Sequence, residues 1–237
     1  MDIPSSLAIV ALAALIHSSF QLSVSVLTLL GGHAIGAKRS QANVLRMITS
    51  FVAGSGVMTV LLLSFASLIL LHVFGNNIPA VAWAAVCGLL VGVGIAVWSF
   101  YYRHERGTSL WVPRGVARYL SERTKATQHS SEAFGLGLSS VIGELLFIAA
   151  PIIISALVLI QLPSNWQLIG IALYATISLL SLVSVWVLIG SGHKLSSIQK
   201  WRESNKYFMQ FAAGSGLVIL GLFVYVTTVI GSSVGAY

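Results

Sequence analysis

Six apolar stretches, separated by short polar segments, constrain the fold of this chain more than any other feature. About 20 consecutive apolar residues cross the hydrocarbon core of a bilayer as an α-helix. Hydrophobic residues make up 57% of the 237 residues and charged residues only 8%, against about a quarter in a soluble domain. We therefore predict an all-α polytopic membrane protein forming one domain, residues 1–237, with two three-helix halves. The predicted spans are residues 6–31, 47–74, 79–101, 133–160, 165–190 and 207–231.

The basic residues lie in alternate loops. The first, third and fifth connections carry all 13 Lys and Arg residues, whereas the turns around NNIP and LPSN carry none. Six spans place these three loops on one side of the membrane, which the positive-inside rule makes cytoplasmic. We expect both termini outside, a basic cytoplasmic loop at 102–132, and a bacterial-type inner membrane as the location.

This charge distribution also bears on partners. The net charge of +7 is explained by topology, so no nucleic-acid partner is expected. The expected partners are the lipid bilayer and a small solute or ion, with a homo-oligomer left open. Within the third loop, apolar residues recur at helical spacing from Trp111 to Leu120, with Arg114 and Arg118 on other faces. This pattern favours a short amphipathic helix on the anionic inner leaflet, with a solvated linker as the alternative.

One short motif occurs twice. FVAGSG (51–56) in the second span returns as FAAGSG (211–216) in the sixth, and the same offset of 160 relates Gly32–His33 to Gly192–His193. Small residues let two helix backbones approach closely in lipid. A direct duplication of the hairpin of spans one and two as spans five and six is also open. The predicted packing residues are Gly54, Ser55, Gly56, Gly214, Ser215 and Gly216.

Glu144 is an acid near the middle of the predicted fourth span. An ionised side chain at that depth costs a few kcal/mol or more. Ser140, Phe147 and Pro151 share its helix face, and Pro151 leaves one backbone carbonyl without its helical partner. The pattern indicates a polar pocket for a substrate or cation. The alternative is a protonated acid that hydrogen-bonds a neighbouring helix.

His17 is the second candidate, at similar depth in the first span. It begins a polar stripe on that helix, and weaker stripes at 55–59 and 174–184 could line the same cavity or simply pack. A His17–Glu144 pair would form a proton relay, whereas a histidine bonded to a backbone carbonyl is the alternative. The predicted substrate or ion pathway comprises Glu144, His17, Gln21, Ser18, Ser140 and Pro151; Ser25 and Thr28 continue the stripe.

The sequence lacks the motifs of several classes of enzyme and of metal or redox site. The single cysteine, Cys87, excludes an internal disulfide, a CxxC redox pair and a cysteine zinc cluster. Haem ligation by His17 and His72 is disfavoured because they lie at different predicted depths. No Ser-His-Asp set, HExxH, Walker or dinucleotide motif occurs in the sequence. We expect no enzyme, and no catalytic, cofactor-binding or metal-binding residues.

The layout resembles a known superfamily. Six spans, a long basic loop between the halves, and the Gly-rich runs CGLLVGVGI and GSGLVILGL resemble the lysine-exporter superfamily. Its plan is similar to the membrane domain of the thiol-disulfide interchange and cytochrome-c biogenesis carriers. AFGLGLSSVIGELLFIAAP also looks like the fourth helix of those carriers. However, their cysteines in spans one and four are absent, and IHSSFQLS replaces the exporters' Pro-Gly-Pro stretch.

The resemblance implies a six-helix fold that moves small solutes or ions, and it implies an inverted relation between the halves, unlike the direct echo above. Together with the buried polar residues, it predicts a secondary transporter or exporter of a small solute or ion, with proton coupling left open. A membrane scaffold or assembly factor is the main alternative. An electron or cofactor carrier is disfavoured by the missing cysteines.

Overall fold

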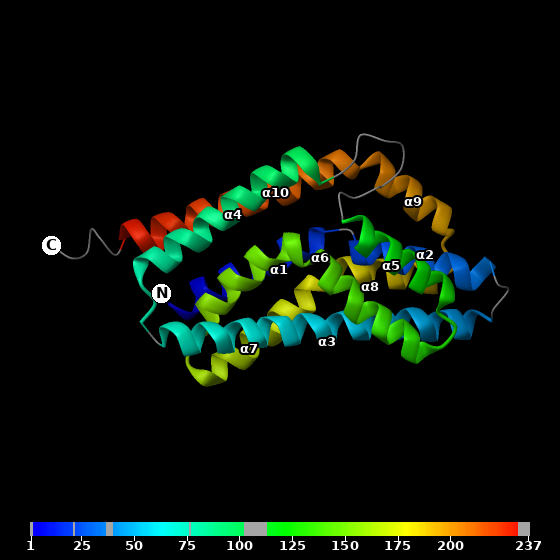
Figure 1. The fold of residues 1–237 in the computed structure, drawn as a ribbon, viewed down its shortest axis with the longest axis horizontal. Helices are drawn as coiled ribbons and strands as arrows, with labels where there is room; N and C mark the ends of the chain where they lie inside the picture. Colours follow the sequence, from blue (N-terminus) through cyan, green and yellow to red (C-terminus); the bar gives the residue numbers. More distant parts are fainter. Residues whose placement is uncertain (1, 21, 37–39, 76, 102–112, 232–237) are drawn as a thin grey trace.

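The computed structural model describes residues 2–20, 22–36, 40–75, 77–101 and 113–231, and every regular element in these ranges is helical. The all-α prediction is therefore confirmed for the described chain. The elements, shown in Figure 1, are α1 (Ile3–Ser19), α2 (Leu22–Gly36), α3 (Gln41–Phe74), α4 (Ala80–Phe100), α5 (Arg114–Ala126), α6 (Ser130–Leu159), α7 (Ser164–Ser178), α8 (Leu180–Gly190), α9 (Leu195–Ser204), α10 (Lys206–Val224) and the π-helical turn η1 (Tyr225–Ile230).

Four of these helices are long and apolar enough to cross a membrane: α3, α4, α6, and α10 continued by η1. Two further candidates are bent pairs, α1 with α2 at 46° and α7 with α8 at 48°. The described chain is thus a helical integral membrane protein with four spans, or up to six if each bent pair is one span. The predicted spans 6–31 and 165–190 each correspond to a bent pair of helices and not to one straight helix.

Local sequence signals explain four helix ends. The Ser40 side chain caps α3 by accepting the Asn43 N–H at 3.4 Å. The same helix ends at Gly75, whose φ of 59° lies in the left-handed region. Pro79 and Pro163 directly precede α4 and α7, where the missing proline N–H costs nothing.

The unbroken helices pack in close pairs through glycine. In α3 against α6, a Cβ on Gly54 would overlap the Phe134 carbonyl, and one on Gly137 would overlap the Phe51 carbonyl. In α4 against α10, which lie side by side in Figure 1, a Cβ on Gly214 would come within 2.9 Å of the Gly94 oxygen. Backbones this close leave no room for a side chain.

The other predicted packing residues make looser contacts. The Ser55 hydroxyl donates to the Gly137 oxygen at 3.3 Å. A Cβ on Gly56 would meet the tip of Leu179 at 3.0 Å, and one on Gly216 would meet Ile16 at 2.9 Å. Ser215 is half-buried.

The basic residues of the described chain gather at one end, which we call the basic end. It contains the start of α3, the short helices α5 and α9, and the start of α10, opposite the α3–α4 turn (Figure 1). The predicted amphipathic helix of the third loop corresponds to α5, although Trp111 and Val112 lie outside the described residues.

The apolar core has two parts that meet near the middle of the molecule. One part is built by α1, α4, α7, α10, the later half of α3 and most of α6, and the other by α2, α5, α8, α9, the start of α3 and the start of α6. The helix breaks lie where the two parts meet. Leu179 follows Phe20 by 159 residues, so the two interruptions have nearly the same offset as the sequence echo.

Candidate functional site

The two helix breaks are joined by hydrogen bonds between two serines. Ser18, near the end of α1, accepts the backbone N–H of Ser181 on its hydroxyl oxygen at 3.1 Å. The Ser181 hydroxyl donates to the Ser18 carbonyl oxygen. The end of α1 is thereby fixed to the first turn of α8.

Neither break contains proline or glycine: the sequences are Ser-Phe-Gln-Leu at 19–22 and Ser-Leu-Leu-Ser at 178–181. Instead, serine hydroxyls donate hydrogen bonds to carbonyl oxygens of the preceding turn. Ser19 donates to Ile16 at 2.6 Å, and Ser178 donates to Ala175 at 3.0 Å. Such bonds weaken a helix but do not end it. The breaks persist because other helices satisfy the backbone groups that they release.

Glu144 is the partner of the first turn of α2. Its Oε1 accepts the Ser23 N–H at 2.9 Å, and its Oε2 accepts the Ser23 hydroxyl at 2.9 Å. The Leu22 backbone also hydrogen-bonds to the carboxyl group. The first N–H groups of a helix carry partial positive charge and lack helical acceptors, so a carboxylate is stabilised there. This explains how the chain keeps an acid that is only 3% exposed.

A buried arginine lies further along α2. Arg202 of α9 is 3% exposed and donates to the Ser25 hydroxyl at 2.7 Å and to the Thr28 hydroxyl at 3.4 Å. Its charge acts on Glu144 through space. A polar row therefore runs from Glu144 along α2 toward the basic end.

A small cavity lies between the breaks and has a volume of about 20 Å³, enough for one water molecule. Polar residues from six helices line it, together with apolar neighbours such as Phe20 and Val141. The polar lining residues are His17, Ser18, Ser23, Ser55, Thr59, Glu144, Ser178 and Ser181.

His17 and Glu144 share this cavity, but each has its own partner. The Nδ1 atom of His17 lies 3.0 Å from the hydroxyl oxygen of Tyr174, which is fully buried in α7. No hydrogen bond joins His17 to Glu144 in the described structure. The alternative prediction, that a backbone carbonyl binds His17, also differs from the structure, because the partner of His17 is the Tyr174 side chain.

The remaining predicted pathway residues fall into three groups. Ser18 lies at the site. Ser140 and Pro151 are buried in α6 but do not line the cavity, and the Ser140 hydroxyl donates to the Gly137 oxygen at 2.8 Å. Ser140 and Pro151 were predicted to line the pathway because they share the helix face of Glu144. That face extends well beyond a cavity of this size. Gln21 lies outside the described residues.

The sequence pattern did not indicate Ser23 or Arg202 as site residues. Ser23 falls off the stripe expected for a continuous first span, and Arg202 was counted only as a loop charge. One signal could have found Ser23: the run His-Ser-Ser-Phe-Gln-Leu-Ser is denser in polar residues than one face of an unbroken helix can hold.

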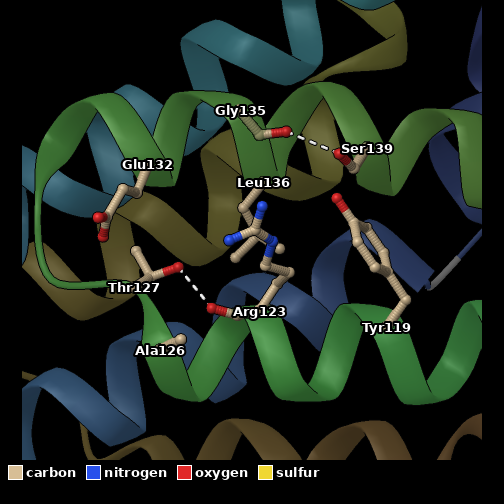
Figure 2. Close-up of a pocket in the computed structure, with 8 residues that line it drawn as sticks. All are labelled: Tyr119, Arg123, Ala126, Thr127, Glu132, Gly135, Leu136 and Ser139. Carbon is tan, nitrogen blue, oxygen red and sulfur yellow. Dashed lines mark hydrogen bonds between the residues drawn. The ribbon is translucent and has the colours of Figure 1, made fainter.

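A larger hollow of about 340 Å³ lies at the basic end, between α5 and the start of α6. Figure 2 shows Arg123 extending from α5 toward α6, between Glu132 and Tyr119, with the Tyr119 hydroxyl pointing toward Ser139. Hydrogen bonding by Arg123, and then by Ser139, lowers the pKa of Tyr119 below its usual value. This hollow shares no lining residue with the cavity at the breaks.

The fold and site define a class: a helical integral membrane protein with a buried polar cavity at two helix breaks. Comparison with family models, with curated proteins and with solved structures finds no match in any of the three. Within the described residues, no group of three or more His, Cys, Asp or Glu side chains could hold a metal ion.

Proposed function

We propose that the protein is a secondary transporter of a small solute or ion, with Glu144 as its ion-responsive residue. The observation that carries the proposal is the meeting of two interrupted helices around a carboxylate bound at a half-helix N-terminus. Irregular backbone within a membrane is tolerated only where protein buries it or where it lines a cavity. Secondary transporters build their substrate and ion sites from such discontinuous helices.

The orientation that we propose follows from the charges. The basic end would face the cytoplasm of a bacterial-type inner membrane, with both termini outside. Glu144 precedes the end of α6 at Leu159 by 15 residues, about 22 Å of helix. The start of α6 at Ser130 lies 14 residues, about 21 Å, on the other side, so the site lies near the middle of the membrane, and the row formed by Ser25, Thr28 and Arg202 leads toward the cytoplasmic face.

In this proposal the serine contacts between α1 and α8 form the closed gate. Opening would separate Ser18 from Ser181 and would expose the cavity, which is too small for a solute larger than water while the gate is closed. The lysine-exporter resemblance agrees with such a function but does not identify the solute.

The rival function is a membrane scaffold, and one observation favours it. Both oxygens of the buried Glu144 carboxyl accept hydrogen bonds from α2, as expected if it only joins α6 to α2. In that case no aqueous reagent should reach the cavity, and substitution of Glu144 should reduce stability without altering any flux.

Cysteine accessibility separates the two functions. In a Cys87→Ala background, Thr59→Cys places a thiol at the cavity, while Ser155→Cys places one at a buried position of α6 away from the cavity. A transporter should allow a membrane-impermeant methanethiosulfonate to modify Thr59→Cys from the basic end in sided vesicles, with Ser155→Cys unmodified. Equal protection of both thiols in folded protein would contradict transport.

Flux is the second measurement. Proteoliposomes on a solid-supported membrane should give a transient current with at least one member of a panel of amino acids, inorganic ions and protons. Glu144→Gln should abolish the current while the protein remains monodisperse. Absence of current across the panel, together with protection of Thr59→Cys, would leave the scaffold function.

A further inference from the structure

The hydroxyl groups around the cavity have a common property: each donates its hydrogen to an acceptor within the protein. Ser23 donates to Glu144, and Ser181 donates to the Ser18 carbonyl. Ser18 lies 3.0 Å from the Ser181 oxygen and can donate to it, because the hydrogen of Ser181 is already used. The other three donate to backbone oxygens: Ser55 to Gly137, Thr59 to Ser55 and Ser178 to Ala175.

An occupant of the cavity would therefore meet acceptors. A hydroxyl that has given up its hydrogen can still offer oxygen lone pairs, and Glu144 adds a carboxylate. The helix N–H groups that would favour an anion are taken, Ser23 by Glu144 and Ser181 by Ser18. The imidazole of His17 is the one lining side chain with a hydrogen to spare, and only in one tautomer.

We infer that this cavity binds a small monovalent cation, either Na⁺ or a hydronium ion, as the coupling ion of the proposed transporter. The role of this cation as a coupling ion rests on the proposed function. The binding of the cation depends only on the residues that line the cavity. Hard cations prefer oxygen ligands, and the C-terminal ends of half-helices coordinate Na⁺ or H⁺ in transporters with broken helices; α1 and α7 both end at this cavity.

Charge and size favour a monovalent ion. The cavity offers one carboxylate and a volume of about 20 Å³, which suits a species the size of water. Arg202, which is buried against α2, is a further positive charge in this region, so one carboxylate would not balance a divalent ion.

Binding can be measured as cation-dependent stability, because a ligand that binds only the folded state raises the unfolding temperature. We expect purified protein in lipid nanodiscs to unfold several degrees higher in NaCl than in choline chloride at equal ionic strength, with KCl close to choline. Thr59→Val removes one oxygen with little change in shape and should weaken the apparent affinity about tenfold. Glu144→Gln should abolish the Na⁺ effect.

The matched control is Thr176→Val, on the exposed face of α7. Its hydroxyl also donates to a carbonyl four residues earlier, at 2.8 Å, but it does not line the cavity. It should therefore leave the Na⁺ effect unchanged. Should Thr59→Val fold poorly, Ser178→Ala tests the same oxygen set.

The hydronium form of the inference has its own result. If Na⁺ has no effect, the unfolding temperature in choline should depend more steeply on pH between 5 and 8 in wild type than in Glu144→Gln, because proton binding at Glu144 is then linked to folding while the histidines contribute to both proteins. A stabilisation by Na⁺ that persists in Glu144→Gln and Thr59→Val would overturn the inference. So would a lack of response to both Na⁺ and pH, or a response to chloride against gluconate.

The stability assay and the current measurement together distinguish failure of the cation site from failure of the proposed transport function. Cation binding without current in proteoliposomes would keep the site and remove transport. Current that is lost in Glu144→Gln, with no cation or pH effect on stability, would keep transport and remove the cation site.

Discussion

The straight helix pairs and the broken helices use opposite ways of packing. In α3 with α6 and in α4 with α10, glycines bring backbones into direct contact, and the helices run without interruption, although side chains such as Ser55 and Gln210 also donate hydrogen bonds across each pair. In α1/α2 and α7/α8, the ladder is interrupted, and side chains from other helices complete it. The first arrangement cannot slide without a steric clash, whereas the second needs only exchange of a few hydrogen bonds.

The difference indicates which parts of the molecule can move. Rigid, glycine-packed pairs suit a frame, and elements held by exchangeable polar contacts suit a gate. Substitutions in the frame should therefore cost more stability than substitutions at the gate.

The largest effect is expected from Gly137→Ala. Its Cβ would overlap the Phe51 carbonyl and come within 2.9 Å of the Ser55 nitrogen, so α3 and α6 must separate. We expect a loss of about 3 kcal/mol or more in the free energy of unfolding, measured by denaturant titration in detergent. Gly135→Ala, two residues away with open space around it, is the control and should be neutral or stabilising. Equal effects of the two substitutions would show that glycine packing does not hold the frame.

A smaller effect is expected at the contact between the breaks. Ser18→Ala leaves the Ser181 N–H without its acceptor and should cost about 1–3 kcal/mol. Ser181→Ala removes the reciprocal donor. A double-mutant cycle in thermal or denaturant unfolding should give a coupling energy of about 1 kcal/mol. Strict additivity would mean that the two breaks are not linked through these serines.

The partner of His17 is expected to contribute less. Tyr174→Phe removes the hydroxyl at 3.0 Å from Nδ1 and should lower the unfolding free energy by about 1 kcal/mol. Tyr225→Phe, at a more exposed position, should have no measurable effect. A Tyr174→Phe variant as stable as wild type would indicate that this hydrogen bond is not maintained.

The smallest effect is expected on cation affinity. Arg202→Gln removes a positive charge that acts on Glu144, so Na⁺ should bind a few-fold more tightly in the nanodisc stability assay. Arg202→Lys keeps the charge and should remain close to wild type. Weaker binding in Arg202→Gln would indicate that Arg202 positions α2 rather than competing with the cation.

The sequence was informative about Glu144 and misleading about its surroundings. Hydropathy and the isolated acid pointed to a buried polar site, and the site does contain Glu144, His17 and Ser18. The expected helix-face neighbours, Ser140 and Pro151, do not line the cavity. A periodicity argument assumes a continuous helix, and it cannot anticipate partners that become available only because another helix is interrupted.

The sequence alone determined the membrane class, the boundaries of the unbroken spans, the segregation of basic residues at one end and the burial of one acid. Each follows from local chemistry, because apolar length, charge spacing and the turn residues Gly75, Pro79 and Pro163 act within a single segment. The tertiary structure alone decided where α1 and α7 end and which groups meet there. Releasing backbone N–H groups inside a membrane is too costly for one segment, so the breaks exist only because Glu144 on α6 and Ser18 on α1 accept those hydrogens.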